Sequence, residues 1–514
     1  MVNSSSNPPM AWKLVGGLAI FKLLTHLLTV GAWGSEWFVD ELYFMACAEH
    51  VDWGYVDMPP FFPFVLTVVT AVLGDGLFVV RMIAATAGAG LVVLIAALAR
   101  EMGGDRWAQA TAGLCVILAP IYLIMHGITT MNALDPLMWV GCALVLARIL
   151  NGGDPRLWLL FGVLAGLGIN NKHTFALWGL SLVIGLLATG ARRHLRSKWI
   201  WLGGGVAVLF FIPNIVWMVE NGFPHLEQLA NIRANQRDVS LSPFAFLGQQ
   251  VLMLNPPSAI LWLSGLVWFI VDPGARRYRP LGVAWLTFIA AMILLKGRPY
   301  YPAAAHPVVL AAGAVALERF SSIGGWRSWV RPVVPAVMAL MGVVIAPLTL
   351  WVLTPDVYVR YTTTLGFDQP RIENHELGPL PQLFADRYGW RELAAEVARV
   401  YHSLSDGDRA KASIFAWGYG QAGAVDRYRE EFELPRAISG HLTYFLWGPG
   451  DATGEVMIVI GDEREDLEEI FETVEVAGRI HHPYSMPYNH VPVHLCRGLK
   501  TTVEELWPRT KNYS

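Results

Sequence analysis

The stretch VDELYFMACAEHVDWGYVDMPPFF, residues Val39 to Phe62, follows the first membrane-length apolar segment and decides how the rest of the chain is interpreted. One short loop here holds six acidic or imidazole side chains, where a chain that only sits in lipid would avoid them: Asp40, Glu41, Glu49, His50, Asp52 and Asp57. Ionisable groups at a membrane boundary point to function by default. We therefore interpret the stretch as the first half of an active site.

The composition indicates a polytopic membrane protein. Hydrophobic residues make up 54% of the chain and charged residues 15%, and 21 tryptophans and 49 glycines suit the aromatic belts and small-residue helix contacts of membrane bundles. The net charge of -3, with no basic domain or tail, gives no indication of a nucleic-acid partner. The four cysteines form no CxxC pair, so neither a zinc site nor a disulfide framework is indicated, although a Cys47–Cys496 bridge stays open.

Apolar runs of roughly 20 residues, the length that crosses a bilayer core, predict a mainly α-helical fold. About eleven spans result, at residues 11–33, 76–99, 107–125, 134–150, 157–171, 174–190, 199–219, 244–270, 280–295, 301–318 and 331–353. The first run is too long for a signal-peptide core and no basic residue precedes it, so we expect an uncleaved anchor.

Arginine and lysine residues concentrate in alternate connections between these spans, which predicts their orientation. The connections near residues 100–106, 148–156, 192–198, 276–279 and 319–331 are arginine-rich and predicted to be cytoplasmic. The unusual polar clusters all fall in the other set, which we predict to lie on the outer face.

The chain changes character near residue 355. Charges become frequent after this point, apolar runs shorten, residues 413–419 and 455–461 have the pattern of buried strands, and residues 462–474 have helical spacing. We predict two domains: a transmembrane catalytic domain with outer-face loops at residues 1–354, and a soluble α/β domain outside the membrane at residues 355–514.

Three carboxylates are candidate catalytic groups. Asp40 and Glu41 begin a segment suited to a short interfacial helix, and adjacent carboxylates in a poorly solvated pocket cannot both ionise cheaply, so one could take a proton. A solvated helix start that favours acids is the alternative. Asp135 lies before Pro136 at the mouth of the fourth predicted span. A plain N-cap by Asn132 or Asp135 is the alternative there.

Several basic residues lie at helix ends that we predict to be on the outer face. This position is opposite to the positive-inside bias, so it requires an explanation. A lipid-linked phosphate would supply one, and snorkelling to lipid headgroups is the competing explanation. The candidates are Lys172 with His173, Arg233 and Arg237, and Lys296 with Arg298, followed by Tyr300 and Tyr301. Lys172 and Lys296 are favoured over Arg237.

The acidic loop also holds residue types that bind divalent metals. His50 and Asp57 are the candidate ligands, with Asp52 beside them. Their spacing is loose and the sequence offers no fourth ligand, which favours a solvated loop.

Six motifs together resemble one family. They are DE at residues 40–41, WGYVDMPP at 53–60, TTMNALDPLMW at 129–139, NNKH at 170–173, NGFPHLEQLANIRAN at 221–235 and KGRPYYPAAAHP at 296–307. The chain resembles bacterial GT-C glycosyltransferases of the dolichyl-phosphate-mannose protein mannosyltransferase-like family, whose relatives add aminoarabinose to lipid A. The resemblance extends into the tail through GYGQAGAVDRY and SGHLTYFLWGP.

The resemblance implies a transferase that uses a polyprenyl-phosphate sugar on the outer side of the bacterial inner membrane. It implies Asp40 as catalytic base, Asp135 across the same cavity, and donor phosphate contacts from Lys172, Lys296 and Tyr301. Arg233 and Tyr300 are less securely implied. Where relatives often have a basic residue or histidine before the paired prolines, this chain has Met58, which puts a donor contact there in doubt.

The residue types suit this chemistry independently. A sugar phosphate departs as an anion, so it needs cations and hydrogen-bond donors, while the incoming hydroxyl needs one carboxylate to take its proton. Direct displacement would invert the anomeric carbon. Membrane lipids and an acceptor lipid, glycan or protein are the expected partners. A lipid or glycan transporter, or a scaffold whose outer domain binds a partner, remain alternatives, although transporters usually show two-half symmetry and midplane sites.

Overall fold

The computed structural model describes residues 7–32, 36–367, 369 and 373–514. The chain forms two compact units, each built from separate segments. Unit 1 comprises residues 1–30, 78–215 and 240–352, and unit 2 comprises residues 31–77, 216–239 and 353–514. The structure thus groups the acidic loop with the tail, whereas the predicted boundary at residue 355 separates them; that boundary stays a prediction.

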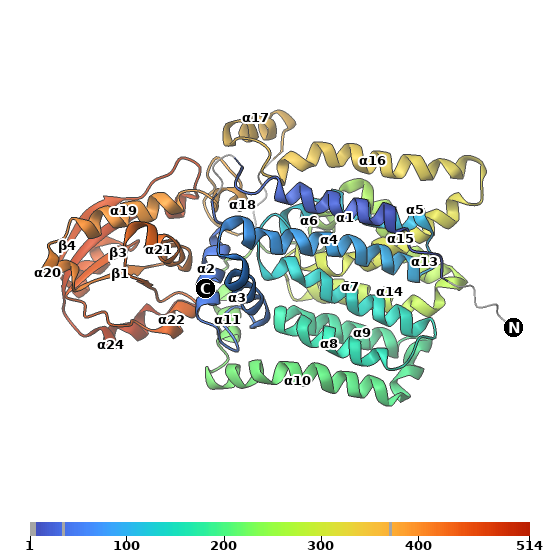
Figure 1. The fold of residues 1–514 in the computed structure, drawn as a ribbon, viewed down its shortest axis with the longest axis horizontal. Coiled ribbons are helices and arrows are strands. Elements are labelled where there is room, and N and C mark those ends of the chain that lie inside the picture. Colours follow the sequence, from blue (N-terminus) through green and yellow to red (C-terminus); the bar gives the residue numbers. More distant parts are fainter. Residues whose placement is uncertain (1–6, 33–35, 368, 370–372) are drawn as a thin grey trace. The chain divides into compact units, whose positions relative to one another are not determined.

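Unit 1 is helical (Figure 1). Its main helices are α1 (Trp12–Leu27), α4 (Leu77–Glu101), α5 (Arg106–Leu118), α6 (Pro120–Met125), α7 (Met131–Leu150), α8 (Leu157–Asn171), α9 (Thr174–Leu187), α10 (Lys198–Glu220), α12 (Pro243–Met253), α13 (Ala259–Val271), α14 (Arg279–Leu294), α15 (His306–Ser321) and α16 (Val330–Ile345). Each of the eleven predicted apolar segments contains a helix or a broken pair of helices. The last residue of the first segment, Trp33, lies outside the described residues.

Among the described residues, four helices are long and apolar enough to cross a membrane, or up to six if each sharply bent pair is one span. Helices α8 and α3 (Phe61–Leu73) are apolar but shorter. The chain is therefore a multi-pass membrane protein, as the composition predicted. The predicted total of about eleven membrane spans is neither confirmed nor contradicted by these helices and stays a prediction.

Small residues let helices of unit 1 approach closely. A Cβ atom on Gly265 of α13 would lie 2.2 Å from the carbonyl oxygen of Val309, and one on Gly313 of α15 would lie 1.8 Å from that of Leu261. Only glycine fits at both positions, so α13 and α15 pack backbone to backbone, as membrane helices with small interfacial residues do.

The arginine-rich connections of unit 1 bond to one another. Glu101 at the end of α4 forms ion pairs with Arg100 and Arg148. The Tyr278 hydroxyl lies 2.6 Å from both the Glu101 carbonyl oxygen and Asn151 Oδ1, and its one proton serves these two acceptors. Three of the polar connections predicted for the opposite face, at residues 126–135, 171–173 and 296–301, meet at Lys172, described below. The sorting of all the connections into two faces and the assignment of one face to the outside stay predictions.

Unit 2 combines α2 (Val39–Glu49), α3 and α11 (Pro224–Ala234) with the tail. The tail contains α17 (Pro355–Leu365), α18 (Gln382–Ala385), α19 (Trp390–His402), α20 (Asp406–Arg409), α21 (Tyr419–Phe432), α22 (Thr443–Trp447), α23 (Arg464–Ile470) and α24 (Val503–Leu506). Its sheet contains β1 (Ala412–Ala416), β2 (Ala437–Ile438), β3 (Val456–Ile460), β4 (Phe471–Arg479) and β5 (Pro492–Leu499) in the order β2-β1-β3-β5-β4.

The sheet is mixed. Strands β2, β1 and β3 are parallel, with Ile414 opposite both Ala437 and Ile458, and β5 is antiparallel to β3 and β4. Helices α19 and α21 lie on one face of this sheet and α24 on the other (Figure 1). The predicted α/β tail is thus present, and its fully buried β3 explains the continuous apolar run at residues 456–460.

All four cysteines are free and buried. The Cys47–Cys496 bridge that the sequence left open is therefore wrong.

Candidate active-site clusters

The adjacent carboxylates of Asp40 and Glu41, both in the first turn of helix α2, differ in burial and in hydrogen bonding. Phe38 precedes the helix in an extended conformation, and the Glu41 side chain accepts a hydrogen bond from the Phe38 backbone N–H at 2.9 Å. Glu41 is 1% exposed, whereas Asp40 is only partly buried. Glu41 thus caps the helix, a known role for an acid at the third helical position, and Asp40 is the carboxylate of the pair that α2 leaves more accessible.

The Asp40 carboxylate is held by the tail. Tyr419, the first residue of α21, donates a hydrogen bond from its hydroxyl to Asp40 Oδ1 at 2.9 Å. Burial and the neighbouring Asp40 carboxylate raise the pKa of Tyr419 well above its usual value, so the hydroxyl stays protonated and keeps donating. Residues 379 positions apart therefore form one local site.

Asp57 ends a second chain of hydrogen bonds. Tyr43 donates its hydroxyl proton to Asp57 Oδ1 at 2.7 Å and lies 2.6 Å from the Thr443 hydroxyl, which accepts from the Val56 N–H at 3.1 Å. Because the Tyr43 proton goes to Asp57, Thr443 donates to Tyr43. Burial, together with the nearby Asp40 charge, raises the pKa of Asp57 to about 6.

A third carboxylate lies near Asp40. Asp386 is 1% exposed and accepts a hydrogen bond from the Tyr488 hydroxyl. Burial, with the charges of Asp40 and Glu373, raises the pKa of Asp386 to about 8, so this carboxyl holds a proton at neutral pH. Unit 2 thus places carboxyl groups with different protonation states around Asp40.

Arg237 is the arginine that accompanies these carboxylates. Its Nε lies 3.5 Å from the Glu373 carboxylate, and its charge lowers the pKa of Asp57 against the effect of burial. Arg233, a donor contact that the family resemblance implies less securely than Lys172, is exposed on α11. The structure therefore places Arg237 with the carboxylates of unit 2.

The second cluster lies in unit 1 around Lys172, which follows α8. Its Nζ donates to Asn132 Oδ1 at 2.7 Å and lies 4.0 Å from the Tyr301 ring centroid and 5.4 Å from that of Tyr300. Lys172 is 8% exposed. A buried ammonium group held by an amide and two aromatic faces suits an anionic ligand.

Asp135 borders this cluster on α7. The helix begins at Met131 with Thr130 as its N-cap, so Asp135 lies beyond the first turn and cannot cap it. The N-cap alternative for Asn132 or Asp135 is therefore wrong. Asp135 is 3% exposed and accepts a hydrogen bond from Trp139 Nε1 at 2.9 Å, one turn further along α7.

The remaining predicted phosphate contacts lie around Lys172 to different degrees. Arg298 donates to the Tyr300 hydroxyl at 3.4 Å, and His173 Nε2 lies 3.2 Å from Asn214 Oδ1. Lys296 is exposed and adopts a left-handed backbone conformation with φ of 53°. Lys172, Tyr300, Tyr301 and Arg298 thus form the cluster, and Lys296 belongs to the same turn of chain as Arg298.

Buried polar bonds fix that turn. Gln250 Nε2 donates to the Pro299 carbonyl at 3.0 Å, His306 Nε2 lies 2.9 Å from Gln250 Oε1, and Trp285 Nε1 donates to His306 Nδ1 at 3.2 Å. His306 therefore positions the loop that carries the tyrosines, the structural role expected of a lone histidine.

The predicted metal ligands do not assemble a metal site. Among the described residues, no three His, Cys, Asp or Glu side chains are placed to hold a metal ion. His50 Nδ1 instead bonds to the Ala46 carbonyl at 3.0 Å and its ring stacks on Trp447, while Asp57 accepts from Tyr43.

Sequence reasoning missed the tyrosines and the amide that complete both clusters. Tyr43 lies one helical turn after Asp40, Tyr419 belongs to the GYGQAGAVDRY motif, and Asn132 to TTMNALDPLMW. Each of these residues belongs to a motif given above. A single sequence, however, does not show that helix α21 packs against helix α2.

Comparisons with known proteins test the predicted family and the predicted fold. Residues 57–217 match a family model described as dolichyl-phosphate-mannose-protein mannosyltransferase. The resemblance predicted from the motifs is therefore confirmed, and the predicted enzyme class, a glycosyltransferase, is the class of the matched family. A search among curated proteins finds no match.

Solved structures share the fold. The chain is similar to ArnT from Cupriavidus metallidurans bound to undecaprenyl phosphate, with 17% identity, a TM-score of 0.59, and coverage of 94% of this chain and 98% of that one. It is also similar to an Archaeoglobus fulgidus oligosaccharyltransferase tethered with an acceptor peptide (14% identity, TM-score 0.50, coverage of 80% and 63%). The mycobacterial arabinofuranosyltransferase AftD matches with 17% identity, a TM-score of 0.50, and coverage of 81% and 30%. The expected GT-C-like helical fold is thereby confirmed.

Proposed function

We propose that this protein is a membrane glycosyltransferase that moves a sugar from a polyprenyl-phosphate donor to an acceptor hydroxyl. The reaction takes place on the outer face of a bacterial inner membrane and inverts the anomeric carbon. The observation that carries the proposal is the Asp40 carboxylate on α2, partly accessible and oriented by the Tyr419 hydroxyl. The family match and the fold support it.

Asp40 is the catalytic base in this proposal. The Tyr419 hydroxyl orients this carboxylate through Oδ1, and the carboxylate takes the proton of the acceptor hydroxyl. Asp386 keeps its proton at neutral pH, so it adds no charge to compete for that proton. The acceptor oxygen forms the new bond to the anomeric carbon while the bond to the phosphate oxygen breaks.

The Lys172 cluster holds the donor phosphate in this proposal. The departing polyprenyl phosphate is an anion, so cations and hydrogen-bond donors stabilise it without a general acid. Lys172, Arg298 and the Tyr301 hydroxyl are the groups assigned to it. Burial lowers the pKa of Lys172, and the nearby Asp135 carboxylate opposes that effect.

The test is donor turnover by the purified full-length protein in lipid nanodiscs. Polyprenyl-phosphate sugar is extracted from a strain that lacks the protein and incubated with it and with that strain's lipid and glycan fractions. We expect release of free polyprenyl phosphate together with sugar on an acceptor. Movement of intact donor between leaflets of proteoliposomes, without cleavage, would establish a transporter and overturn the proposal.

A further inference from the structure

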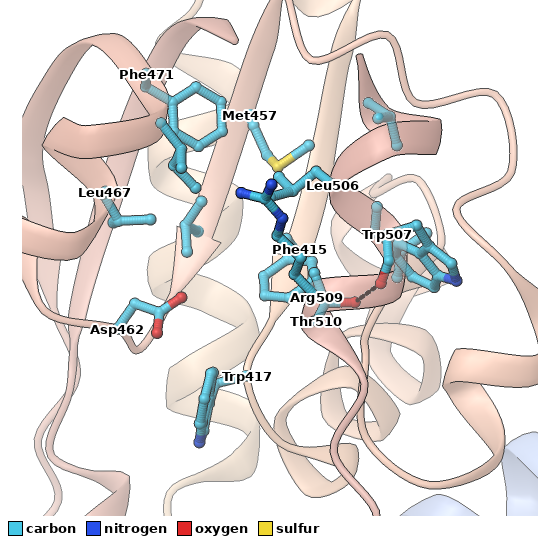
Figure 2. Close-up of a pocket in the computed structure, with 14 residues that line it drawn as sticks. Phe415, Trp417, Met457, Asp462, Leu467, Phe471, Leu506, Trp507, Arg509 and Thr510 are labelled. Carbon is cyan, nitrogen blue, oxygen red and sulfur yellow. Dashed lines mark hydrogen bonds between the residues drawn. The ribbon is translucent and has the colours of Figure 1, made fainter. Parts of the chain in front are cut away.

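The tail contains a pocket that the proposed reaction does not use. It has a volume of about 170 Å³ and lies on one face of the five-stranded sheet. Its floor is buried and apolar, formed by Phe415, Met457, Val459, Leu467 and Phe471. Figure 2 shows Trp417, Asp462, Arg509 and Thr510 drawn with these residues around the same space.

The pocket lies where an α/β sheet places its ligands. From β1 the chain passes to β2 on one side, and β3 then pairs with the opposite side of β1. Such a reversal creates a crevice at the carboxyl ends of the two strands, the usual ligand position in open α/β sheets. Trp417 directly follows β1, and Asp462 comes two residues after the end of β3.

Two features of these residues are unusual for a purely structural loop. Trp417 leaves 51% of its surface exposed, and Asp462 adopts a left-handed backbone conformation with φ of 65°. Non-glycine residues with such φ values are uncommon and cluster at functional sites. Burial, with Asp466 and Glu463 nearby, also raises the pKa of Asp462 to about 6.

The polar groups define the kind of ligand. Within the described residues, neither Asp462 nor Arg509 forms an ion pair, although both line the pocket. The pocket thus carries one acidic and one basic side chain that do not pair with each other. A carboxylate that accepts, a guanidinium that donates and an exposed indole face together suit the hydroxyl groups and C–H face of a sugar ring.

We propose that this pocket binds the acceptor through a sugar ring that carries a small apolar group, with the ring on Trp417 and the apolar group on the floor. The volume is below the roughly 300–1,000 Å³ of pockets for drug-sized ligands, so one aromatic ring or a short chain fits and a lipid tail does not. The identification of the bound sugar as the acceptor rests on the proposed function. The binding of a sugar ring to the pocket is independent of that function.

The experiment measures binding of phenyl β-D-glucopyranoside to the full-length protein in nanodiscs by saturation-transfer NMR, without donor. We expect saturation of both the phenyl and the sugar protons, and weaker transfer to glucose alone. Empty nanodiscs provide the background for partition into lipid.

Variants test the assignment to this pocket. Trp417→Ala and Arg509→Ala change exposed side chains, so the fold should tolerate them, and each should raise the dissociation constant about three- to tenfold. Leu506→Trp fills the pocket from a half-buried position and should abolish binding. The matched control is Arg399→Ala, an exposed arginine on α19 that does not line the pocket.

The outcomes separate this inference from the proposed function. The proposed binding site would be overturned if the wild type does not bind the glucoside, or if all three pocket variants bind it as the wild type does. This holds even if the wild type transfers sugar. Binding lost in the pocket variants but kept in Arg399→Ala supports the site even if no transfer is found. If transfer occurs, unchanged acceptor KM in Trp417→Ala and Leu506→Trp would overturn the acceptor assignment alone.

Discussion

Asp40 is a half-buried acid of the first loop whose hydrogen-bond partner comes from the far end of the chain. Glu41 caps α2, and Asp57 is bonded to Tyr43, but Asp40 receives its hydrogen bond from Tyr419 of the tail. A base must present its free lone pair along a fixed direction, and this bond restricts rotation of the carboxylate. Tyr419 is thus a positioning residue in our account.

Replacing Tyr419 with Phe should lower kcat about tenfold and leave the donor KM unchanged. The variant removes one hydrogen bond, worth about 1.4 kcal/mol when it orients a charged group, and keeps the ring in its tilted contact with Tyr43. Steady-state kinetics in nanodiscs measure the effect. Tyr428→Phe on the same helix is the control. A change in KM with constant kcat would contradict a positioning role.

Replacing Lys172 with Met should weaken binding of polyprenyl phosphate roughly 10- to 100-fold, the loss expected for one charge-assisted hydrogen bond. Methionine keeps the length of the side chain between Asn132 and Tyr301 but removes the charge. Native mass spectrometry of the purified protein with added polyprenyl phosphate gives the affinity. Lys198→Met, at the start of α10, should bind like the wild type. Equal affinity in both variants would remove Lys172 from the donor site.

At the scale of elements, two glycines in α21 allow the tail to reach α2. A Cβ atom on Gly420 would lie 2.4 Å from Val39 Cγ2, and one on Gly423 would lie 3.0 Å from the Leu42 backbone carbon. These glycines belong to the motif GYGQAGAVDRY. The motif therefore has a structural explanation, since it brings Tyr419 within hydrogen-bonding distance of Asp40.

Gly423→Leu should separate α21 from α2 and reduce transfer more than Tyr419→Phe does, because the whole helix has to move. Its overpacking should cost about 1–3 kcal/mol in stability. Transfer rate and apparent melting temperature are measured together. Gly407→Ala, whose added Cβ would have open space in α20, is the control. Full activity of Gly423→Leu would show that the contact between α2 and α21 has no part in catalysis.

The long apolar helices and the strands β1 and β3 could be predicted because apolar length and period are local properties. The run at residues 455–461 became β3, and the predicted helix at 462–474 ends at Ile470 because β-branched and aromatic residues then form β4. The predicted strand at 413–419 stops at Ala416, since Gly418 and Tyr419 begin α21. The residues at which these helices and strands end depend on tertiary contacts, which a local sequence pattern does not reveal.

The candidate site was predictable only in part for the same reason. Asp40, Asp135 and Lys172 stood out as charges at predicted membrane boundaries, and that signal is present in one sequence. Tyr419, Tyr488 and Thr443 have ordinary neighbours in the chain and contribute only because the tail folds with the first loop in one unit. Long-range packing supplies these partners.

At the scale of the whole molecule, unit 2 carries a buried carboxyl whose ionisation opposes folding. The pKa of Asp386 is about 8, against about 3.9 for an ordinary aspartate, so the folded state holds a proton that the unfolded chain releases between these values. Stability from this group is therefore fully present below about pH 4 and is lost as the pH rises through about 8.

Asp386→Asn should remove this pH dependence, because asparagine stays neutral and its carbonyl can still accept from Tyr488. The apparent melting temperature of the variant should rise relative to the wild type from about pH 5 to about pH 9. Differential scanning fluorimetry of the full chain measures it, with the exposed Asp451→Asn as the control. A difference that does not change with pH would contradict the raised pKa.

The most direct test of the account is the amount of polyprenyl-phosphate sugar, quantified by lipid mass spectrometry, in a host strain lacking this protein and complemented with single variants. Wild type and Asp451→Asn should consume the accumulated donor, whereas Asp40→Asn, expressed at the same level, should leave it as high as in the uncomplemented strain. Consumption of the donor by Asp40→Asn at the wild-type rate would contradict Asp40 as the base and, with it, the proposed mechanism.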